Sequence, residues 1–225
     1  MTMDFSAERL SYEKGELLES QLPNSPKDLV EQWLQQAIEQ KLSEPYAMSL
    51  ATCGSDLRPN VRTVLLREMQ SLQGLGEKNA DFGLVFYTNY DSQKGGDLAQ
   101  NPHAQVLFFW HALERQIRVS GKIELLSEEK STAYFHKRPH DSQIAAWVSA
   151  PQSGVVESRK VMDDKFAQLI AQYPQGMAVP KPDFWGGYVL IAQQVEFWQG
   201  RANRMHDRIR YEKVGENWTM SRLLP

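Results

Sequence analysis

Apolar residues recur along this chain at two different periods, and the first is the period of a helix. Ser25 and Pro26 suit a helix start, because serine caps a first turn well and proline is tolerated at the first helical position. Residues 1–24 are polar without a clear period, and we expect them to form a mobile N-terminal arm. The residues after Pro26 place one apolar stripe on a surface helix: Leu29, Val30, Trp33, Leu34, Ala37, Ile38 and Leu42.

Beyond Pro45 the period shortens to the alternation that is typical of strands. In residues 60–68 this alternation would place Val61, Thr63, Leu65 and Arg67 on one face of a strand. Residues 70–81 read as a polar loop. Strands are predicted at 47–52, 60–68, 82–89, 104–111 and 115–126, and within 185–200 and 208–225, the last with a hairpin signal at Gly215.

Helical patterns interrupt these strands. Residues 92–100 predict a short helix that a glycine pair weakens. Ser127 is a candidate N-cap for a helix over 127–138, and acids follow it in the first turn, where they complement the helix dipole. Residues 141–149 predict another short helix. A longer one is predicted over 157–173, with Val161, Phe166, Leu169 and Ile170 on one side.

The order of these elements predicts the fold class. No repeat, low-complexity tract or interior linker divides the chain, so we expect residues 25–225 to form a single α+β domain. Many short strands with inserted helices favour an antiparallel barrel over a doubly wound parallel sheet. No G-x-G-x-x-G follows a predicted strand, so the sequence does not support a Rossmann dinucleotide site.

Composition narrows the classes of partner. The chain has 225 residues and a net charge of -3, so no global positive field attracts nucleic acid or anionic membranes. No run of about 18 apolar residues is present, and we expect no membrane span. The first residues include early acids, unlike a secretory signal, and the single Cys53 fits a reducing compartment. The cytoplasm is therefore the expected location, with an organelle possible if the N-terminus was trimmed.

The most informative segment for chemistry is 195–211. It concentrates cationic side chains beside Trp198, and arginine offers a planar fork that suits phosphate and carboxylate groups. If the run is extended, Arg204, His206 and Arg208 point to the same face. The composition fits equally well a solvated edge strand whose arginines pair with acids. The cations and imidazole are Arg201, Arg204, His206, Arg208 and Arg210.

A second candidate site lies in 132–147. Tyr134, Arg138 and Ser142 are four residues apart and could converge on a phosphate monoester near a helix N-terminus. The alternative is that Asp141 or Ser142 simply caps that helix. A third set is also consistent with phosphate contacts: Arg62, Arg67, residues 87–89, Ser92 and Lys94. The five histidines show no zinc-ligand spacing, so no metal site is predicted.

These motifs resemble a known family. EFWQGRANRMHDR (196–208) is similar to the C-terminal signature of pyridoxamine 5'-phosphate oxidases, and the resemblance covers about residues 9–225. The other motifs fall in the family's order: RTVLLR, FYTN, SQK, ERQIRVSGK, YFHKRPHDSQIAAWVS, QS and FWGGY. The resemblance implies a split β-barrel homodimer with FMN at the subunit interface. It also implies oxidation of pyridoxamine 5'-phosphate or pyridoxine 5'-phosphate to pyridoxal 5'-phosphate, with O2 reduced to H2O2 and NH3 released from the amine.

The resemblance also implies roles for residues. Arg204 and His206 would be catalytic, lying over the pyridine ring to orient it and to stabilise developing charge. The substrate would further contact Arg9, Tyr12, Arg67, Tyr134, Arg138 and Ser142, of which Arg9 and Tyr12 belong to a lid-like arm. FMN would contact Arg62, Thr63, Val64, Leu65, Leu66, Arg67, Tyr87, Thr88, Lys94, Gln116, Gln152, Ser153, Trp198 and Arg208.

The sequence departs from the family pattern at two phosphate-binding positions. Arg67 stands where lysine is usual, which keeps the charge and changes the geometry. Gln93 stands where arginine is usual, which removes a cation beside Lys94. An extra residue near Ala150 and Pro151 shifts the alignment before Gln152 by one, and the loop at 70–81 is longer than expected.

Other functions fit parts of the pattern. Split barrels also host other flavin reductases, deazaflavin-dependent enzymes and haem-binding proteins, since fold does not fix function. A non-catalytic carrier of pyridoxal 5'-phosphate would need the substrate-side residues and not the flavin set. A nucleic-acid binder is disfavoured by the net charge and by the acids that flank the arginine cluster.

Overall fold

The computed structural model describes residues 3–4, 6, 11–72 and 82–225. In these ranges the helices are α1 (Pro26–Glu39), α2 (Gln93–Gln100), α3 (Glu128–Lys137), α4 (His140–Val148) and α5 (Arg159–Gln172). The strands are β1 (Ala47–Cys53), β2 (Pro59–Leu65), β3 (Glu68–Ser71), β4 (Phe82–Asn89), β5 (His103–Trp110), β6 (Arg115–Leu125), β7 (Trp185–Gln199), β8 (Asp207–Val214) and β9 (Asn217–Leu223). Short 3-10 turns occur at Glu19–Gln21, His111–Leu113 and Ala202–Arg204.

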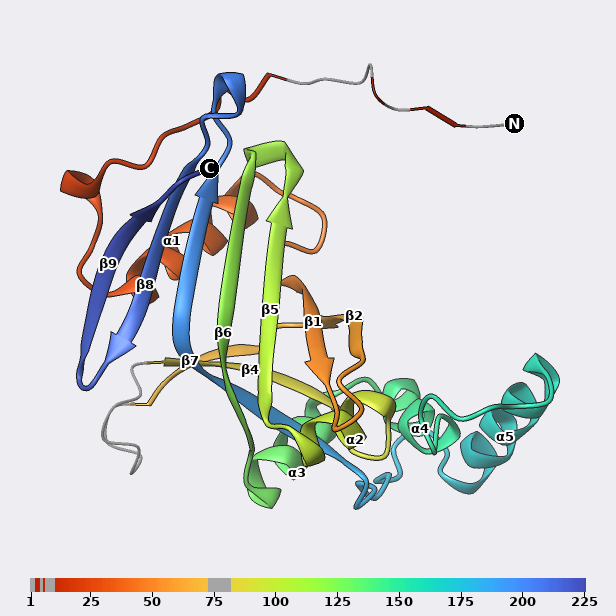
Figure 1. Ribbon diagram of the computed structural model, residues 1–225. Coiled ribbons are helices and arrows are strands. Elements are labelled where there is room, and N and C mark those ends of the chain that lie inside the picture. The colour runs from red at the N-terminus through yellow and green to blue at the C-terminus, as the bar shows by residue number, and fades with distance from the viewer. Residues whose placement is uncertain (1–2, 5, 7–10, 73–81) are drawn as a thin grey trace.

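The strand pairs in the described ranges are antiparallel and belong to one sheet, in the order β2-β1-β5-β6-β7-β4-β3 (Figure 1). Strand β8 pairs with β7, and β9 pairs with β8. The long strand β7 organises the sheet: its first half pairs with β4 and its second half with β8. The register of β6 on β7 shifts at Gly121, where a Cβ atom would lie 1.8 Å from the Ile191 carbonyl oxygen. Glycine therefore permits the close approach at which the ladder bends. The sheet is open along its length and does not close into a full barrel.

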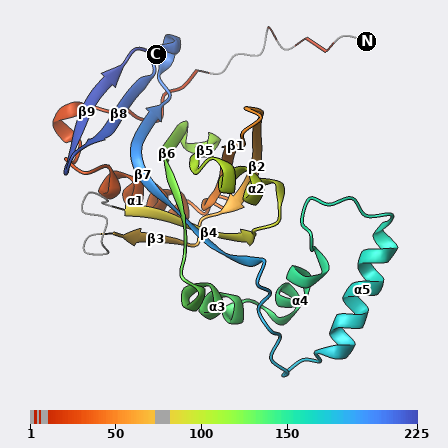
Figure 2. The ribbon, with the colours of Figure 1, turned by 60° about the horizontal axis from the view of Figure 1, so that its bottom comes forward.

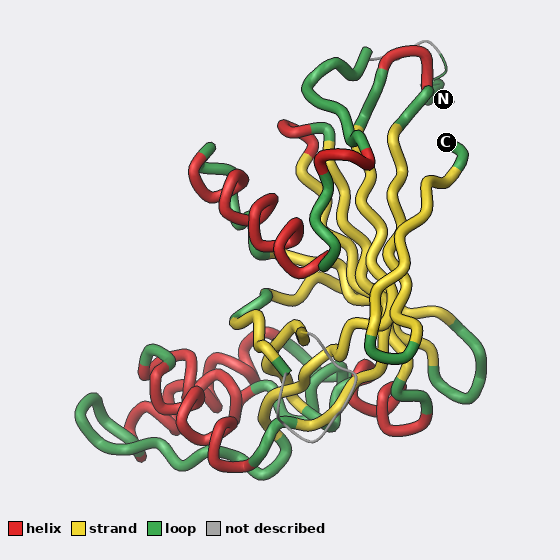
Figure 3. The backbone as a smooth tube through the Cα atoms, turned by 90° about the vertical axis from the view of Figure 1, so that its left-hand side faces the viewer, coloured by secondary structure: helices red, strands yellow, loops and turns green. Residues whose placement is uncertain are grey.

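The helices lie in two places. The apolar stripe of α1 packs on the strands, with Trp33 edge-on to Phe197 at 5.3 Å between ring centroids, although Ile38 is exposed. Figures 2 and 3 show α3, α4 and α5 gathered at the end of the sheet that lies away from both chain termini. There they form a smaller apolar cluster with Trp185 at the start of β7. The larger apolar core contains Val195 and Phe197 near the end of β7, and the second cluster contains Trp185 at its start.

Three details of the predicted elements are wrong. Residues 70 and 71, predicted as the start of a loop, belong to the separate strand β3. The strand expected over 60–68 ends at Leu65, because the next N–H groups turn to different strands: Leu66 donates to Tyr46 O and Arg67 to Val85 O. Arg67 therefore does not continue the face of Val61. In addition, Val161 on α5 is exposed instead of packing with the helix's other apolar residues.

The segment predicted as a mobile arm makes defined contacts with the rest of the chain from Tyr12 onwards. Leu17 is buried, its N–H donates to Asp207, and Tyr211 Oη donates to Pro23 O at 2.8 Å. Mobility of this segment stays a prediction. No helix in the described ranges is long and apolar enough to cross a membrane. The same ranges contain no cluster of three histidine, cysteine or acidic side chains that could hold a metal ion.

Candidate active site

The side chain of Lys94 lies at the start of α2, almost fully buried among neutral oxygen atoms. Its Nζ donates to Thr88 Oγ1 (3.1 Å), Ser92 Oγ (3.1 Å) and Gln152 Oε1 (2.8 Å). Burial, with a smaller contribution from the Arg62 cation, lowers the pKa of Lys94 to about 8. Within the described ranges this ammonium pairs with no carboxylate. Such a cation is poised for an anion that would complete its pairing.

Arg62 lies beside this cluster on β2 and is fixed by its own strand and by β1. Its Nη1 donates to Leu50 O at 3.1 Å and to Thr52 Oγ1 at 2.7 Å, and Nη2 lies 3.9 Å from Asp97 Oδ2. Burial lowers the pKa of Arg62, against the opposing effect of Asp97. The other predicted FMN contacts on this stretch are half-buried or exposed: Thr63, Val64, Leu65 and Leu66.

Gln93, at the departure from the family pattern, joins the same cluster. Its Nε2 donates to Asn60 Oδ1 at 3.0 Å, and its backbone N–H donates to Ser153 Oγ at 3.4 Å. Ser153 and Gln152 therefore approach α2 from the loop after α4. The structure brings Arg62, Lys94 and this loop together, and an arginine at position 93 would add a second cation beside Lys94.

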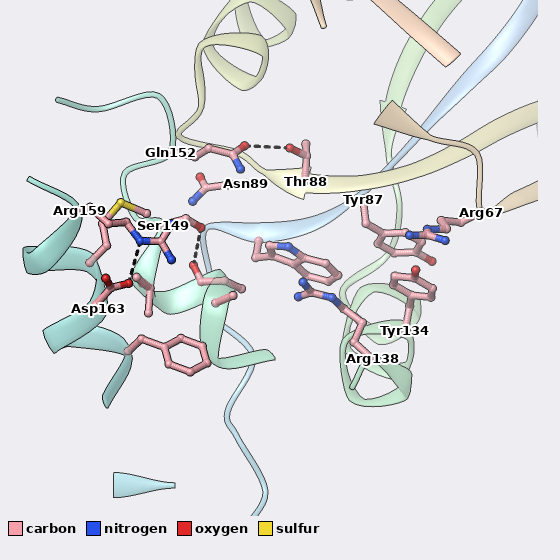
Figure 4. Close-up of a pocket in the computed structure, with 16 residues that line it drawn as sticks. Arg67, Tyr87, Thr88, Asn89, Tyr134, Arg138, Ser149, Gln152, Arg159 and Asp163 are labelled. Atoms are coloured by element: carbon pink, nitrogen blue, oxygen red, sulfur yellow. Dashed lines mark hydrogen bonds and ion pairs between the residues drawn. The ribbon is translucent and has the colours of Figure 1, made fainter. Parts of the chain in front are cut away.

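A cavity of about 570 Å³ opens next to this cluster, between β4, β7 and the helices α3 to α5 (Figure 4). Tyr87 and Tyr134 stack on its wall with ring centroids 3.8 Å apart, and Trp185 extends the stack. The guanidinium of Arg138 lies over the Trp185 ring, 4.8 Å from its centroid. Its Nη1 is buried and has no hydrogen-bond partner among the described residues. A planar cation at a cavity wall suits a phosphate.

This one cavity connects Arg138 to the Lys94 cluster, because Thr88 and Gln152 line it as well. Arg67 lies at its edge, and its charge, after the larger effect of burial, contributes to a lowered pKa of Arg138. The structure thus brings Tyr134 and Arg138 together. Ser142 does not line the cavity, and its backbone N–H instead donates to Pro139 O at 2.9 Å in the first turn of α4.

A second group of predicted site residues lies on β6, β7 and β8. Gln116 pairs with Trp198, and Trp198 pairs with Arg208, so the three side chains share one face of the sheet. They border a smaller cavity of about 200 Å³. Arg208 is held by the buried carboxylate of Glu196, whose Oε1 accepts its Nε–H at 2.9 Å. Glu196 also pairs with Arg118.

The loop after β7 carries Arg204 and His206, and it is not extended. Asn203 and Arg204 have positive φ values of 57° and 61°, and the Arg201 N–H donates to His206 Nδ1 at 3.1 Å. The extended run that would have placed Arg204, His206 and Arg208 on one strand face is therefore not formed, since β8 begins only at Asp207. Burial and the Arg204 charge lower the pKa of His206, which favours a neutral ring with Nε2–H free to donate.

Tyr12 completes this second group from the N-terminal segment. Its ring stands edge-on to Trp198, with centroids 5.8 Å apart, and to His206 at 5.6 Å. The rings of Trp198 and His206 are themselves 4.7 Å apart. Arg9, the other predicted arm residue, lies outside the described residues.

The two groups lie at opposite ends of β7. Trp185 begins the strand at the Arg138 cavity, and Trp198 lies near its other end, beside the C-terminus (Figure 1). An extended strand rises about 3.3 Å per residue, so a single chain cannot bring both groups around one small ligand without a sharp fold in β7. The predicted site residues in the described ranges therefore form two separate groups, one near each end of β7.

Comparison with known proteins identifies the family. Residues 34–173 match the family model described as pyridoxamine 5'-phosphate oxidase, and residues 185–225 match the pyridoxine 5'-phosphate oxidase C-terminal dimerisation region. The chain belongs to the pyridoxamine 5'-phosphate oxidase family. A pyridoxine/pyridoxamine 5'-phosphate oxidase of Psychrobacter cryohalolentis is 58% identical, with 100% of both chains covered. One of Acinetobacter baumannii is 52% identical over 99% of this chain and 97% of its own.

Solved structures agree with this membership. PhzG from Burkholderia lata, in complex with tetrahydrophenazine-1-carboxylic acid, is 29% identical with a TM-score of 0.82, covering 93% of this chain and 98% of its own. An FMN-binding protein from Nostoc punctiforme, related to pyridoxamine 5'-phosphate oxidase, is 16% identical with a TM-score of 0.68, over 91% of this chain and 100% of its own. The predicted fold class is confirmed, as an open sheet of the family's split-barrel type.

Two site features of this family member were missed from sequence. Trp185 supports both Tyr87 and Arg138, and only its place in the FWGGY motif could have signalled it. Glu196 anchors Arg208 from the strand face that alternation assigns to Trp198. Asn89 belongs to the 87–89 set that the sequence singled out, and it lines the large cavity, with an Nδ2 that is buried and has no hydrogen-bond partner among the described residues.

Proposed function

We propose that the protein oxidises pyridoxamine 5'-phosphate and pyridoxine 5'-phosphate to pyridoxal 5'-phosphate, with FMN as cofactor and O2 as electron acceptor. The amine reaction consumes O2 and water and yields NH3 and H2O2, and the alcohol reaction consumes O2 and yields H2O2. The observation that carries the proposal is one cavity that is lined by Arg138 and by Thr88 and Gln152, two hydrogen-bond partners of the Lys94 ammonium. Two phosphate esters, one on the cofactor and one on the substrate, match two separate cationic sites. The names of the full-length relatives support the same reaction.

The residues fit FMN on structural grounds. Lys94 is a buried cation among neutral oxygens, and Thr88 and Gln152 extend its polar surface into the cavity. These residues would hold the phosphate of FMN, with Arg62 and Ser153 beside them. A volume of about 570 Å³ lies in the ordinary range for cofactor and ligand pockets. When bound, FMN supplies the oxidation chemistry, since it accepts the hydride that leaves the C4' carbon of the substrate.

The chain's own residues bind and orient the substrate. Arg138 and Tyr134 would hold its phosphate on the cavity wall, with Arg67 at the edge. Arg204 and His206 would lie over the pyridine ring, where the neutral His206 can donate a hydrogen bond from Nε2. Anchoring at the phosphate and at the ring fixes the distance and angle between the reacting atoms, which is how positioning lowers a barrier.

We further propose a homodimer in which each site takes one half-site from each subunit. The half-sites lie at opposite ends of β7, and the C-terminal residues match a dimerisation region. The sheet face that carries Trp198 and Gln116 also exposes Phe109 and Val61, and apolar residues open to solvent on a strand face suit a subunit contact. A cytoplasmic location stays a prediction.

The first experiment tests oxidation directly. The purified protein loaded with FMN should lose its yellow absorbance when pyridoxamine 5'-phosphate is added without oxygen, and recover it with H2O2 release in air. Pyridoxamine without its phosphate is the control and should bleach far more slowly, because Arg138 then has no partner. A protein that stays yellow with both phosphorylated substrates would refute the proposed reaction. Bleaching by a tetrahydrophenazine carboxylic acid instead would favour an activity like that of the PhzG relative.

A second experiment tests the shared site. Two inactive variants, Lys94→Met in one half-site and Arg208→Met in the other, should regain activity when co-expressed. In a mixed dimer one site carries both changes and the other carries neither, so about half of its sites are intact. If both groups served one site within a single subunit, the mixture would stay inactive.

A further inference from the structure

Glu114 lies between two parts of the chain. One is the N-terminal segment, residues 11–24, and the other is the active-site loop, residues 200–206, which carries Arg204 and His206. Glu114 follows the turn His111–Leu113 with a φ of 55°, and it is buried, with 8% of its surface exposed. Its Oε2 accepts two backbone N–H groups from the segment, those of Glu13 at 2.8 Å and Lys14 at 2.9 Å. A buried carboxylate that accepts two N–H groups forms charge-assisted hydrogen bonds, which are stronger than neutral ones.

The main chain of Glu114 holds the loop on its other side. Its carbonyl oxygen accepts the Gly200 N–H at 2.8 Å and the Gln199 Nε2–H at 3.2 Å. Gly200 begins the stretch that leads to Arg204 and His206. One residue thus binds the N-terminal segment through its side chain and the active-site loop through its backbone.

The segment and the loop fit closely where Glu114 joins them. A Cβ atom on Gly200 would lie 2.8 Å from Tyr12 Cβ, and one on Gly15 would lie 2.8 Å from Gln199 Oε1. At both positions only the hydrogen atom of glycine fits, so a larger side chain at either glycine would disturb the contact between the segment and the loop. This contact places the Tyr12 ring edge-on to both Trp198 and His206.

The left-handed backbone of Glu114 indicates that a glutamate is present at this position because its side chain is needed. Left-handed φ values are uncommon for residues that carry a Cβ, and glycine or asparagine suits them better. A glutamate held there retains a carboxylate at the point where the two N–H groups arrive. Unfavourable backbone conformations of this kind are kept where the surrounding structure or function requires the side chain.

We propose that Glu114 is a positioning residue for the reaction under Proposed function, on which this inference rests. Its carboxylate holds the N-terminal segment so that Tyr12 covers Trp198 and His206. It acts through Tyr12 and touches neither substrate nor cofactor. Docking of the segment is then controlled from a turn between β5 and β6, remote in sequence from both the segment and the loop.

Hydrogen exchange tests the anchor without any catalytic readout. The Glu13 and Lys14 amides should be protected in the unaltered protein and exchange at least tenfold faster in Glu114→Gln. Glu114→Gly should behave alike, because glycine suits the left-handed backbone and any loss then reflects the missing carboxylate. Glu124→Gln, the same chemical change at a surface ion pair of β6, should leave these amides protected. Unchanged exchange in both Glu114 variants would overturn the proposal, and so would a loss of protection that spreads equally through β6 and β7.

Steady-state kinetics tests the link to Tyr12. Glu114→Gln should raise KM for pyridoxamine 5'-phosphate about fivefold or more, while kcat per bound flavin changes less than twofold. In a Tyr12→Ala background the same substitution should add less than a twofold change, because the contact it controls is already lost. Additive effects would overturn the positioning role. If the unaltered protein shows no oxidation at all, the proposed function fails, and the exchange experiment still decides whether Glu114 anchors the segment.

Discussion

Glu196 on β7 holds Arg208 on β8, with Oε1 accepting the Nε–H at 2.9 Å, although the two residues are not directly paired in the strand register. Burial alone would raise the pKa of Glu196. The hydrogen bonds and charges of Arg208 and Arg118 outweigh that effect, and the pKa of Glu196 is lowered. The carboxylate is thus ionised at neutral pH and fixes an arginine that the family resemblance assigns to FMN.

Replacing Glu196 by Gln should therefore weaken FMN binding. A hydrogen bond to a charged group contributes about 1.5–3 kcal/mol, so the FMN dissociation constant should rise roughly tenfold or more. Flavin fluorescence quenching measures it. The matched control is Glu212→Gln, since Glu212 forms a more exposed ion pair with Arg210 at 3.7 Å. Equal, small effects of both substitutions would show that Arg208 needs no help from Glu196.

The affinity for FMN should fall as the pH rises above about 8. Burial lowers the pKa of Lys94 to about 8, so its ammonium is present below that pH and lost above it. A bound phosphate stabilises the charged form and raises this pKa, which means that binding takes up a proton at alkaline pH. Titrations between pH 7 and 9.5 measure the effect. Lys94→Arg should flatten the profile, because arginine keeps its charge, and an equally steep profile in that variant would point to another titrating group.

Restoring the family's cation at position 93 should strengthen FMN binding. Gln93 now bonds to Asn60, and its backbone reaches Ser153 at the same cluster as Lys94. In Gln93→Arg we expect a dissociation constant several-fold lower, through an added charge-assisted hydrogen bond to the phosphate. Isothermal titration at two salt concentrations measures it, with a larger gain at low salt. An unchanged constant would mean that Lys94 and its neighbours already satisfy the phosphate.

Arg138 should control substrate binding without controlling FMN. Arg138→Ala removes the guanidinium that lines the cavity wall, and KM for pyridoxamine 5'-phosphate should rise about 10- to 100-fold. Arg159→Ala is the control, because Arg159 lines the same cavity but is exposed and paired with Asp163 at 2.8 Å. Its effect on KM should stay within about twofold. Comparable increases in both variants would show that the cavity attracts phosphate by its general charge.

The sequence predicted elements whose signals are local. The Ser25 cap, the alternation of β1 and the hairpin at Gly215 depend on neighbouring residues, and all are present. The end of β2 at Leu65 was missed, because it depends on a hydrogen bond from the Arg67 N–H to the carbonyl oxygen of Val85 on the distant strand β4. The loop that carries Arg204 is likewise shaped by positive φ values at non-glycine residues, which no local pattern indicates.

Site residues were recognisable as motifs, but their arrangement was not. The spacing of Tyr134 and Arg138 brings both to one cavity wall, whereas Ser142 at the same spacing stays in the turn that begins α4. Glu114 and Glu196 were missed because each acts on a residue far away in the chain. Such contacts form only when the folded sheet brings the two residues together, so no periodic pattern in the sequence indicates them.

The length of β7 has a consequence for how the protein must be measured. If each complete site combines the Trp185 end of one copy with the Trp198 end of another, cofactor loading and association are linked equilibria, and each promotes the other by mass action. The apparent affinity for FMN then depends on protein concentration: dilution weakens binding, and excess flavin drives self-association. A dissociation constant for this protein therefore has meaning only together with the chain concentration at which it was obtained.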